Sequence, residues 1–160
     1  MTQTSRSARG PRPGSAARVP GIDYGRLPVH FGYALKRAQV VAFDAFERAT
    51  AGVQITPPRF TALVILEANP GISQSALGEV LGTARSGAMM LTNWLVGRKL
   101  AERRHRPDDK RSWGLYLTLG GRRLAARLKR RVYAHDQRVV ARLTPRERRE
   151  LLRLLEKVAG

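Results

Sequence analysis

Residues 85–95 place two kinds of side chain on opposite faces of one expected helix. At 100° per residue, the small or aliphatic Ala88, Leu91 and Leu95 share one face. The opposite face carries a cation, two hydrogen-bonding groups and a thioether: Arg85, Ser86, Asn93 and Met89, with Met90 at the edge. Such groups can bind the edges of DNA bases, because Asn suits adenine N6/N7, Ser can hydrogen-bond a base edge, and Arg takes guanine O6/N7 or a phosphate.

The segment Asp109-Lys110-Arg111 forms a second group of this kind, at a polar tip between two strand-like runs. A guanidinium at a hairpin tip can enter a narrow minor groove, where A/T sequence has its most negative potential. Asp109 can orient Arg111 through a bidentate ion pair; the alternative is a surface pair worth about 0–1 kcal/mol. The remaining cations of the hairpin are expected to bind phosphates, which position a protein without specifying sequence: Arg103, Arg104, Arg106 and Lys110.

The charge of the chain also favours binding to nucleic acid. Its formal net charge is +18, and the excess is uneven, because residues 1–80 carry 9 Lys/Arg against 5 Asp/Glu, whereas residues 81–160 carry 21 against 7. Such self-repulsion opposes compaction, and a polyanion partner relieves it. Nucleic acid is the partner that this distribution favours. A solvated, Arg-rich surface encoded by a GC-rich genome would also explain the excess, but it would not explain the clustering.

No arrangement in the sequence indicates catalysis or a bound metal. The three histidines, His30, His105 and His135, are widely spaced and have no neighbouring carboxylate cluster. Cysteine is absent, which excludes disulfides, Cys-based zinc sites and thiol redox sensing. We therefore expect no enzymatic activity, no cofactor and no metal.

The sequence also predicts a cytoplasmic, nucleoid-associated protein. No apolar run approaches the ~20 residues that a membrane span needs, and the first 25 residues lack the apolar region of a secretory signal. Residues 1–25 are expected to form a disordered basic tail, because they hold several arginines and little to bury. Three interpretations of this tail stay open: an inert extension, an arm on DNA phosphates, or a segment resembling a mitochondrial transit peptide.

Three helices are expected before residue 83. The first begins near Pro28 and ends by Gly52, with one apolar stripe formed by Phe31, Leu35, Ala38, Ala42 and Phe46. The second follows an N-cap at Thr56 and runs towards Ala68. After the turn Asn69-Pro70-Gly71, Ser73 caps a short third helix, Ile72 packs against Leu77, and Gly82 ends it.

The second half is expected to contain three more helices and a hairpin. Thr83 caps a fourth helix that runs to about Arg98, and short helices joined by a tight turn containing Gly are typical of a helix-turn-helix. Strand-like runs follow at 101–106 and 112–117, in which Trp113, Leu115 and Leu117 alternate with small or polar residues. A hairpin in this position is a wing. Thr118 caps a long helix reaching about Leu143, and Thr144-Pro145-Arg146-Glu147 is a capping box that opens a last helix.

Several of these stretches resemble the MarR family of bacterial regulators over roughly residues 27–158. Asp109-Lys110-Arg111 resembles the family's D-x-R wing tip, and Leu117-Thr118 with Gly121 resembles its L-T-x-x-G entry to the fifth helix. The leucine spacing of residues 77–100 is similar to its third and fourth helices. Gly87, Met89 and Met90 depart from the family, which usually has polar or basic residues there; a Met can touch thymine methyls, or it can pack against the wing.

The resemblance implies a fold that is mainly α with a small β-hairpin. A winged helix-turn-helix would occupy residues 56–117, with dimerisation helices at 26–52 and 118–160 in one domain. The implied protein is an obligate homodimer that binds palindromic double-stranded DNA as a transcriptional regulator, with Ser73 added to the DNA contacts named above. The stripes Phe31/Leu35 and Leu151/Leu155 would be dimer surface; the alternative is that they close a monomeric core.

A finer resemblance concerns the effector. Residues 33–39, with Phe43 and Phe46, and residues 67–74 resemble the subgroup that responds to hydroxycinnamoyl-CoA thioesters such as p-coumaroyl-CoA or feruloyl-CoA. This implies a repressor that an aromatic ligand releases from DNA, with Lys36 and Arg37 binding CoA phosphates and Phe43 and Phe46 binding the ring. The alternative is that the cations are solvated and the aromatic rings are core. Two other functions stay open: a basic RNA-binding protein and an architectural DNA-binding protein.

Overall fold

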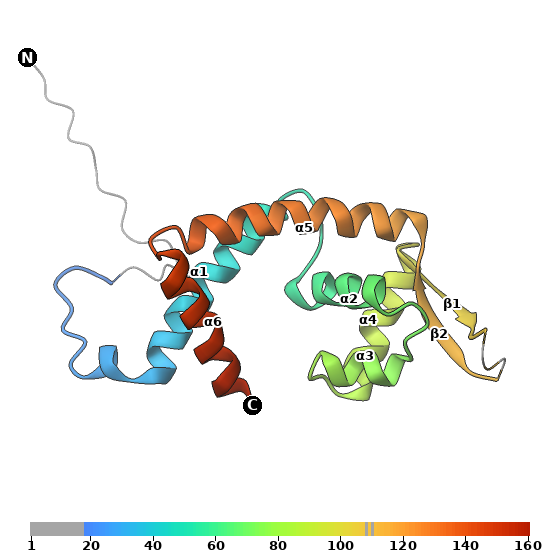
Figure 1. Cartoon of the computed structure of the whole chain (residues 1–160), viewed down its shortest axis with the longest axis horizontal. Helices are drawn as coiled ribbons and strands as arrows, with labels where there is room; N and C mark the ends of the chain where they lie inside the picture. Colours follow the sequence, from blue (N-terminus) through green and yellow to red (C-terminus); the bar gives the residue numbers. More distant parts are fainter. Residues whose placement is uncertain (1–17, 108, 110) are drawn as a thin grey trace, which may run out of the picture.

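The computed structural model describes residues 18–107, 109 and 111–160. Figure 1 shows an elongated molecule in which the long helix α5 links a group of short helices and a hairpin at one end to α1 and α6 at the other. The elements in chain order are η1 Leu27–Val29, α1 Phe31–Ala49, α2 Pro57–Ala68, α3 Gln74–Val80, α4 Arg85–Gly97, β1 Ala101–His105, β2 Trp113–Leu117, α5 Leu119–Val139 and α6 Pro145–Ala159. The predicted fold class, mainly α with a small β-hairpin, is confirmed.

Most of the predicted tail, residues 1–17, lies outside the described residues. In residues 18–25, positions 20, 21 and 25 lie in turns. The Val19 amide donates to the Tyr24 hydroxyl (3.0 Å) and the Gly25 amide donates to Asp23 Oδ1 (2.8 Å).

The hydrophobic core lies at the end of the molecule that carries the hairpin. Its members come from the segment before α2 and from α2, α3, α4, both strands and α5: Ile55, Ala62, Leu63, Leu66, Leu77, Leu95, Ala101, Leu115, Leu117, Ala125 and Leu128. On α4, Ala88 and Leu95 are 1% and 0% exposed and Leu91 is half-buried, which confirms the predicted inner face. Burial of each leucine contributes roughly 1.5–3 kcal/mol to the stability of the fold. The core therefore holds α4 with its inner face buried and its outer face in solvent.

The hairpin pairs antiparallel in the register Ala101↔Leu117 to His105↔Trp113. A third segment joins it, because Gly71 N donates to Leu115 O (2.9 Å) and Leu115 N donates to Ile72 O (3.0 Å). A Cβ at Gly114 would lie 2.7 Å from Gly71 O, so only glycine permits this approach. The sequence predicted residues 69–71 only as a turn; the glycine inside a strand was the signal for this contact.

Three predicted helix caps are confirmed. Ser73 Oγ accepts from Ala76 N (3.1 Å) and Thr118 Oγ1 accepts from Gly121 N (3.0 Å). At α6 the capping box is complete, since Glu147 N donates to Thr144 Oγ1 (3.3 Å) and Thr144 N donates to Glu147 Oε2 (2.8 Å). These hydrogen bonds satisfy amide groups that the first helical turn leaves without partners.

Two predicted helix starts were wrong. The first helix begins at Phe31, not near Pro28, which lies in η1; His30 separates the two because its backbone is extended (φ −83°, ψ 125°). The fourth helix has Ala84 as its N-cap, with no side-chain cap, rather than Thr83. Thr83 instead lies against α4, where a Cβ on Gly87 would meet its Oγ1 at 2.3 Å.

Two other predictions need smaller corrections. The long helix ends at Val139 rather than about Leu143, because residues 140–143 turn, with Leu143 N donating to Val140 O (2.9 Å). Trp113 does not continue the buried face of Leu115 and Leu117; it is 56% exposed and packs on His105, with 4.1 Å between ring centroids.

Helix α5 is the scaffold that joins the two ends. It packs against α1 and α2, and Lys129 on α5 forms an ion pair with Glu67 on α2. Among the described residues, no helix combines the length and apolar character that a bilayer crossing requires.

Candidate nucleic-acid interface

The α4 face predicted to bind bases is exposed along its length. Arg85, Ser86, Met89 and Asn93 all face solvent, and Met89 is 49% exposed. Helix α3 and helix α4 are joined by a tight turn in which Gly82 has φ 59°. The sequence therefore predicted the exposure of this face correctly, because the apolar period of α4 alone decides which side is buried.

The Asp109 carboxylate organises the wing turn. Its Oδ1 accepts from Arg111 N (2.9 Å) and its Oδ2 accepts from Ser112 Oγ. The Ser112 hydroxyl, the Arg111 amide and the nearby positive charge of Arg106 hold the pKa of Asp109 below its usual range. The turn is therefore built around an ionised carboxylate at neutral pH.

The bidentate ion pair predicted between Asp109 and Arg111 is not formed. Both carboxylate oxygens accept hydrogen bonds from the turn itself, so Asp109 positions the backbone of Arg111 rather than its guanidinium. The Arg111 side chain is exposed at the wing. Lys110, predicted to bind phosphate, lies outside the described residues.

The neighbouring arginines of β1 leave the strand on opposite sides. Arg104 lies over Tyr116, with its guanidinium carbon 4.1 Å from the ring centroid, and pairs with Glu102 (Nε to Oε1, 3.3 Å). Arg103 donates from Nη2 to Asn93 Oδ1 (2.9 Å) on α4. Arg104 remains exposed on the wing, as a phosphate contact requires, whereas Arg103 reaches the predicted base-reading residue.

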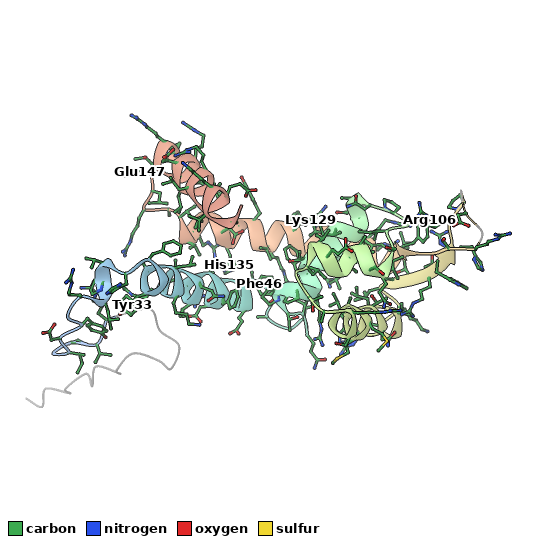
Figure 2. The ribbon with its side chains drawn as sticks, turned by 90° about the horizontal axis from the view of Figure 1, so that it is seen from below. Tyr33, Phe46, Arg106, Lys129, His135 and Glu147 are labelled. Atoms are coloured by element: carbon green, nitrogen blue, oxygen red, sulfur yellow. The ribbon has the colours of Figure 1, made fainter. Side chains whose placement is uncertain are left out.

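The other two predicted contacts lie at the edges of this surface. The hydroxyl oxygen of Ser73 caps α3 and the residue is half-buried, so its first role is structural. Arg106 is half-buried next to the wing turn. Figure 2 shows Arg106 at the wing end of the molecule, with Tyr33 and Glu147 at the opposite end.

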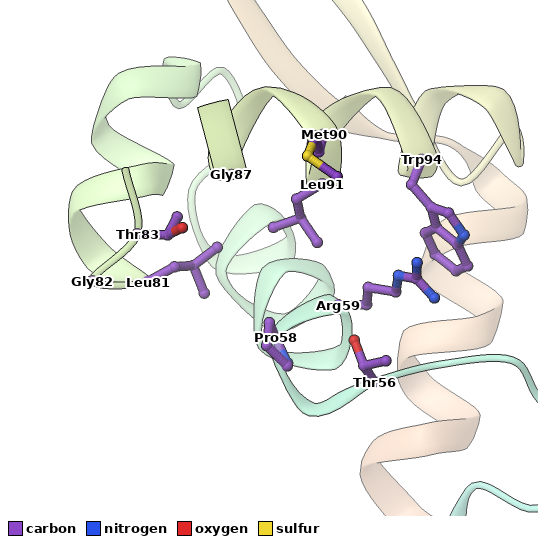
Figure 3. Close-up of a pocket in the computed structure, with 10 residues that line it drawn as sticks. All are labelled: Thr56, Pro58, Arg59, Leu81, Gly82, Thr83, Gly87, Met90, Leu91 and Trp94. Atoms are coloured by element: carbon purple, nitrogen blue, oxygen red, sulfur yellow. The ribbon is translucent and has the colours of Figure 1, made fainter. Parts of the chain in front are cut away.

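A cavity of about 530 Å³ opens beside α4, on the side that faces α2. Figure 3 shows Met90, Leu91 and Trp94 of α4 along one side, and Arg59 extending from α2 towards Trp94. The guanidinium carbon of Arg59 lies 4.0 Å from the Trp94 ring centroid. Met90 lines this cavity and is 71% exposed. The alternative that Met90 packs against the wing is therefore wrong.

The four residues predicted to bind an effector do not meet within this chain. On α1, Arg37 and Phe46 lie about 180° apart at 100° per residue. Phe46 packs on Phe60, with 5.7 Å between ring centroids, and the Arg37 guanidinium lies 5.9 Å from the Tyr33 ring. Lys36 and Phe43 are exposed and share one face, two turns apart.

Comparison with known proteins decides the family. The MarR family profile matches residues 53–112. A protein of Thauera aromatica, assigned as a transcriptional regulator for the hcr operon, is 33% identical over 84% of this chain and 82% of its own length. The chain belongs to the MarR family.

Solved structures of similar proteins extend this result to the whole fold. The transcriptional repressor CouR bound to a 23-mer DNA duplex superposes with a TM-score of 0.81 and 38% identity, covering 87% of this chain and 99% of that one. CouR bound to p-coumaroyl-CoA gives a TM-score of 0.76 and 37% identity, covering 86% and 97%. This MarR-family protein is a DNA-binding transcriptional regulator and not an enzyme.

Sequence reasoning missed two contacts at the candidate interface of this MarR-family protein. One is the contact from Arg103 to Asn93, which joins the wing to α4. The other is the Arg59–Trp94 stack at the cavity. Neither pair has a motif or a periodic spacing, so no local signal in the sequence could have found it.

Proposed function

We propose that the protein is a repressor that binds a palindromic operator as a homodimer and acts at the nucleoid. The observation that carries the proposal is that the α4 face and the wing residue Arg111 are both exposed, in the half of the chain that holds 21 Lys/Arg against 7 Asp/Glu. A helix presented in this way docks in the major groove, and two copies reach half-sites about one helical turn apart.

Each of the predicted DNA-binding residues then has a distinct role. Asn93 and Ser86 hydrogen-bond base edges, and Arg85 binds guanine or a phosphate. Met89 contacts thymine methyl groups, which favours A/T at its position. Arg111 enters the minor groove, while Arg104, Arg106 and Lys110 bind phosphates and set the register.

The homodimer is supported by apolar side chains that the single chain leaves exposed. On α6, five large apolar residues are 38–62% exposed: Leu151, Leu152, Leu154, Leu155 and Val158. On α1, Phe31 and Leu35 are 58% and 43% exposed. A monomer rarely leaves two such stripes in water, so we propose that α1, α5 and α6 of two chains cover them together.

Sedimentation equilibrium should therefore give twice the chain mass. Leu155→Glu should shift the protein towards monomer, because it puts a charge into the proposed interface. Arg146→Glu on the same helix, at an exposed position without a predicted interface role, is the control and should leave the dimer intact. A wild-type protein that sediments as a monomer at micromolar concentration would contradict the proposal.

We further propose that an aromatic acyl-CoA thioester releases the protein from DNA. The support is the similarity to CouR, whose structure with p-coumaroyl-CoA aligns with 86% of this chain. Lys36 and Phe43 share an exposed face of α1 and suit a phosphate and an aromatic ring. Phe46 packs on Phe60 within the chain and is not part of the proposed ring site.

Thermal denaturation with p-coumaroyl-CoA, feruloyl-CoA and the free aromatic acids tests this proposal. A thioester at 100 times its Kd should stabilise the fold by about 2.7 kcal/mol, which raises Tm by roughly 5–10 °C in a protein of this size. Lys36→Ala should weaken the shift in Tm. Arg59→Ala, which changes the cavity beside α4 instead, is the control and should leave the shift unchanged. If Tm stays unchanged with every thioester, the effector proposal is contradicted, whereas the DNA-binding function is not affected.

A further inference from the structure

Arg103 occupies a position between the wing and the two helices of the helix-turn-helix. Its Cα pairs with that of Leu115, which is 2% exposed and faces the core. Paired residues of antiparallel strands project to the same face of a sheet. The Arg103 side chain therefore leaves β1 on the side of α3 and α4, whereas Arg104, one residue later, leaves on the other side and lies over Tyr116.

The guanidinium of Arg103 joins three elements. Its Nη2 donates to Asn93 Oδ1 on α4 (2.9 Å) and, over a longer distance, to Gln74 Oε1 at the start of α3 (3.4 Å). A guanidinium has donors and no acceptor, so only the amide oxygen of Asn93 can face it. The amide is therefore held in one of its two orientations, with Nδ2 directed away from Arg103.

This orientation matters for reading a base. A side-chain amide that meets adenine must present its oxygen to N6 and its nitrogen to N7, so a flipped amide presents the wrong order. An amide that is already oriented also loses less conformational entropy when DNA binds. The donor–acceptor order of Asn93, and not only its place on α4, is thus set by a residue of the wing.

We propose that Arg103 is a positioning residue that sets the base preference of Asn93. The proposal rests on the proposed function, because it assumes that the exposed face of α4 reads DNA. It differs from a phosphate contact in a testable way: loss of a phosphate contact weakens all sequences alike, whereas loss of a positioning contact relaxes one base position.

The test is selection from a randomised duplex pool, followed by affinity measurements on single-base variants of the selected site. Wild type, Asn93→Ala, Arg103→Ala, Arg103→Lys, Arg104→Ala and the double variant Asn93→Ala/Arg103→Ala are compared. Arg104→Ala is the matched control, since it removes the same charge from the adjacent residue of β1 without touching Asn93.

Asn93→Ala and Arg103→Ala should relax preference at the same base position in each half-site, by about fivefold or more. The double variant should relax this base preference no further than Asn93→Ala does. Arg103→Lys should retain part of the preference, because an ammonium can also donate to Asn93 Oδ1. Arg104→Ala should weaken binding to all sites while keeping the preference.

An Arg103→Ala variant that behaves as Arg104→Ala does, or that relaxes a different position, would overturn the inference while leaving the repressor function intact. A wild-type protein that selects no motif would overturn the proposed function and the inference together.

Discussion

Replacement of Arg111 by alanine is expected to lower affinity for the specific operator at least about tenfold, which corresponds to about 1.4 kcal/mol. Arg111 is exposed at the wing, and the Asp109 carboxylate holds its backbone amide in place. A guanidinium placed in a narrow minor groove meets the strongest negative potential of the duplex. In a homodimer each variant complex loses two such contacts, which multiplies the effect.

The measurement is a titration by fluorescence anisotropy on a duplex taken from the selected pool. Arg142→Ala serves as the matched control: it removes the same charge from the exposed turn between α5 and α6, at the opposite end of the molecule. The control should change affinity by less than about twofold. A change below about threefold for Arg111→Ala would show that the wing assignment is wrong.

Replacement of Gly121 by alanine is expected to cost about 3 kcal/mol or more of the free energy of unfolding. Gly121 is buried in the first turn of α5, and an added Cβ would lie 1.9 Å from the backbone oxygen of Leu100. That oxygen already accepts from Thr118 N (3.1 Å), so the connection between α4 and β1 is held directly against the start of α5. Backbone on both sides leaves no side chain that could move aside.

Gly120→Ala is the control, because its Cβ would meet its nearest neighbour, Thr118 Oγ1, at an ordinary 3.6 Å. It should be neutral or stabilise the helix by up to about 1 kcal/mol. Urea denaturation of both variants gives the comparison, and the lost 3 kcal/mol should lower Tm by roughly 6–12 °C. Equal stability of the two variants would contradict this account of the α4–α5 junction.

Local rules predicted much of the fold. The caps at Ser73, Thr118 and Thr144 follow from side chains that bind amide groups three residues away, so a short window of sequence holds all the information. The inner and outer faces of α4 follow from its helical period. The cap at Thr83 failed because Gly87 leaves room for the Thr83 side chain against α4, a contact that a cap rule does not consider.

The candidate site was predicted in part. The sequence placed Arg85, Ser86, Met89 and Asn93 on one face, and the structure confirms that this face is exposed. It could not show that Asp109 binds the turn backbone rather than the Arg111 guanidinium, because that choice depends on the dihedral angles of the turn. The sequence also did not predict the contact between Arg103 and Asn93, because the strand register decides which of two adjacent arginines faces the helices.

Chemical footprinting on a duplex selected by the protein tests the central claim most directly. A dimer that docks α4 of each chain in the major groove and Arg111 in the minor groove should protect two major-groove segments about one helical turn apart, related by the two-fold axis of a palindrome, with minor-groove protection outside them. Continuous protection without a preferred register, or tighter binding to structured RNA than to any duplex, would contradict the claim that this chain reads a DNA sequence.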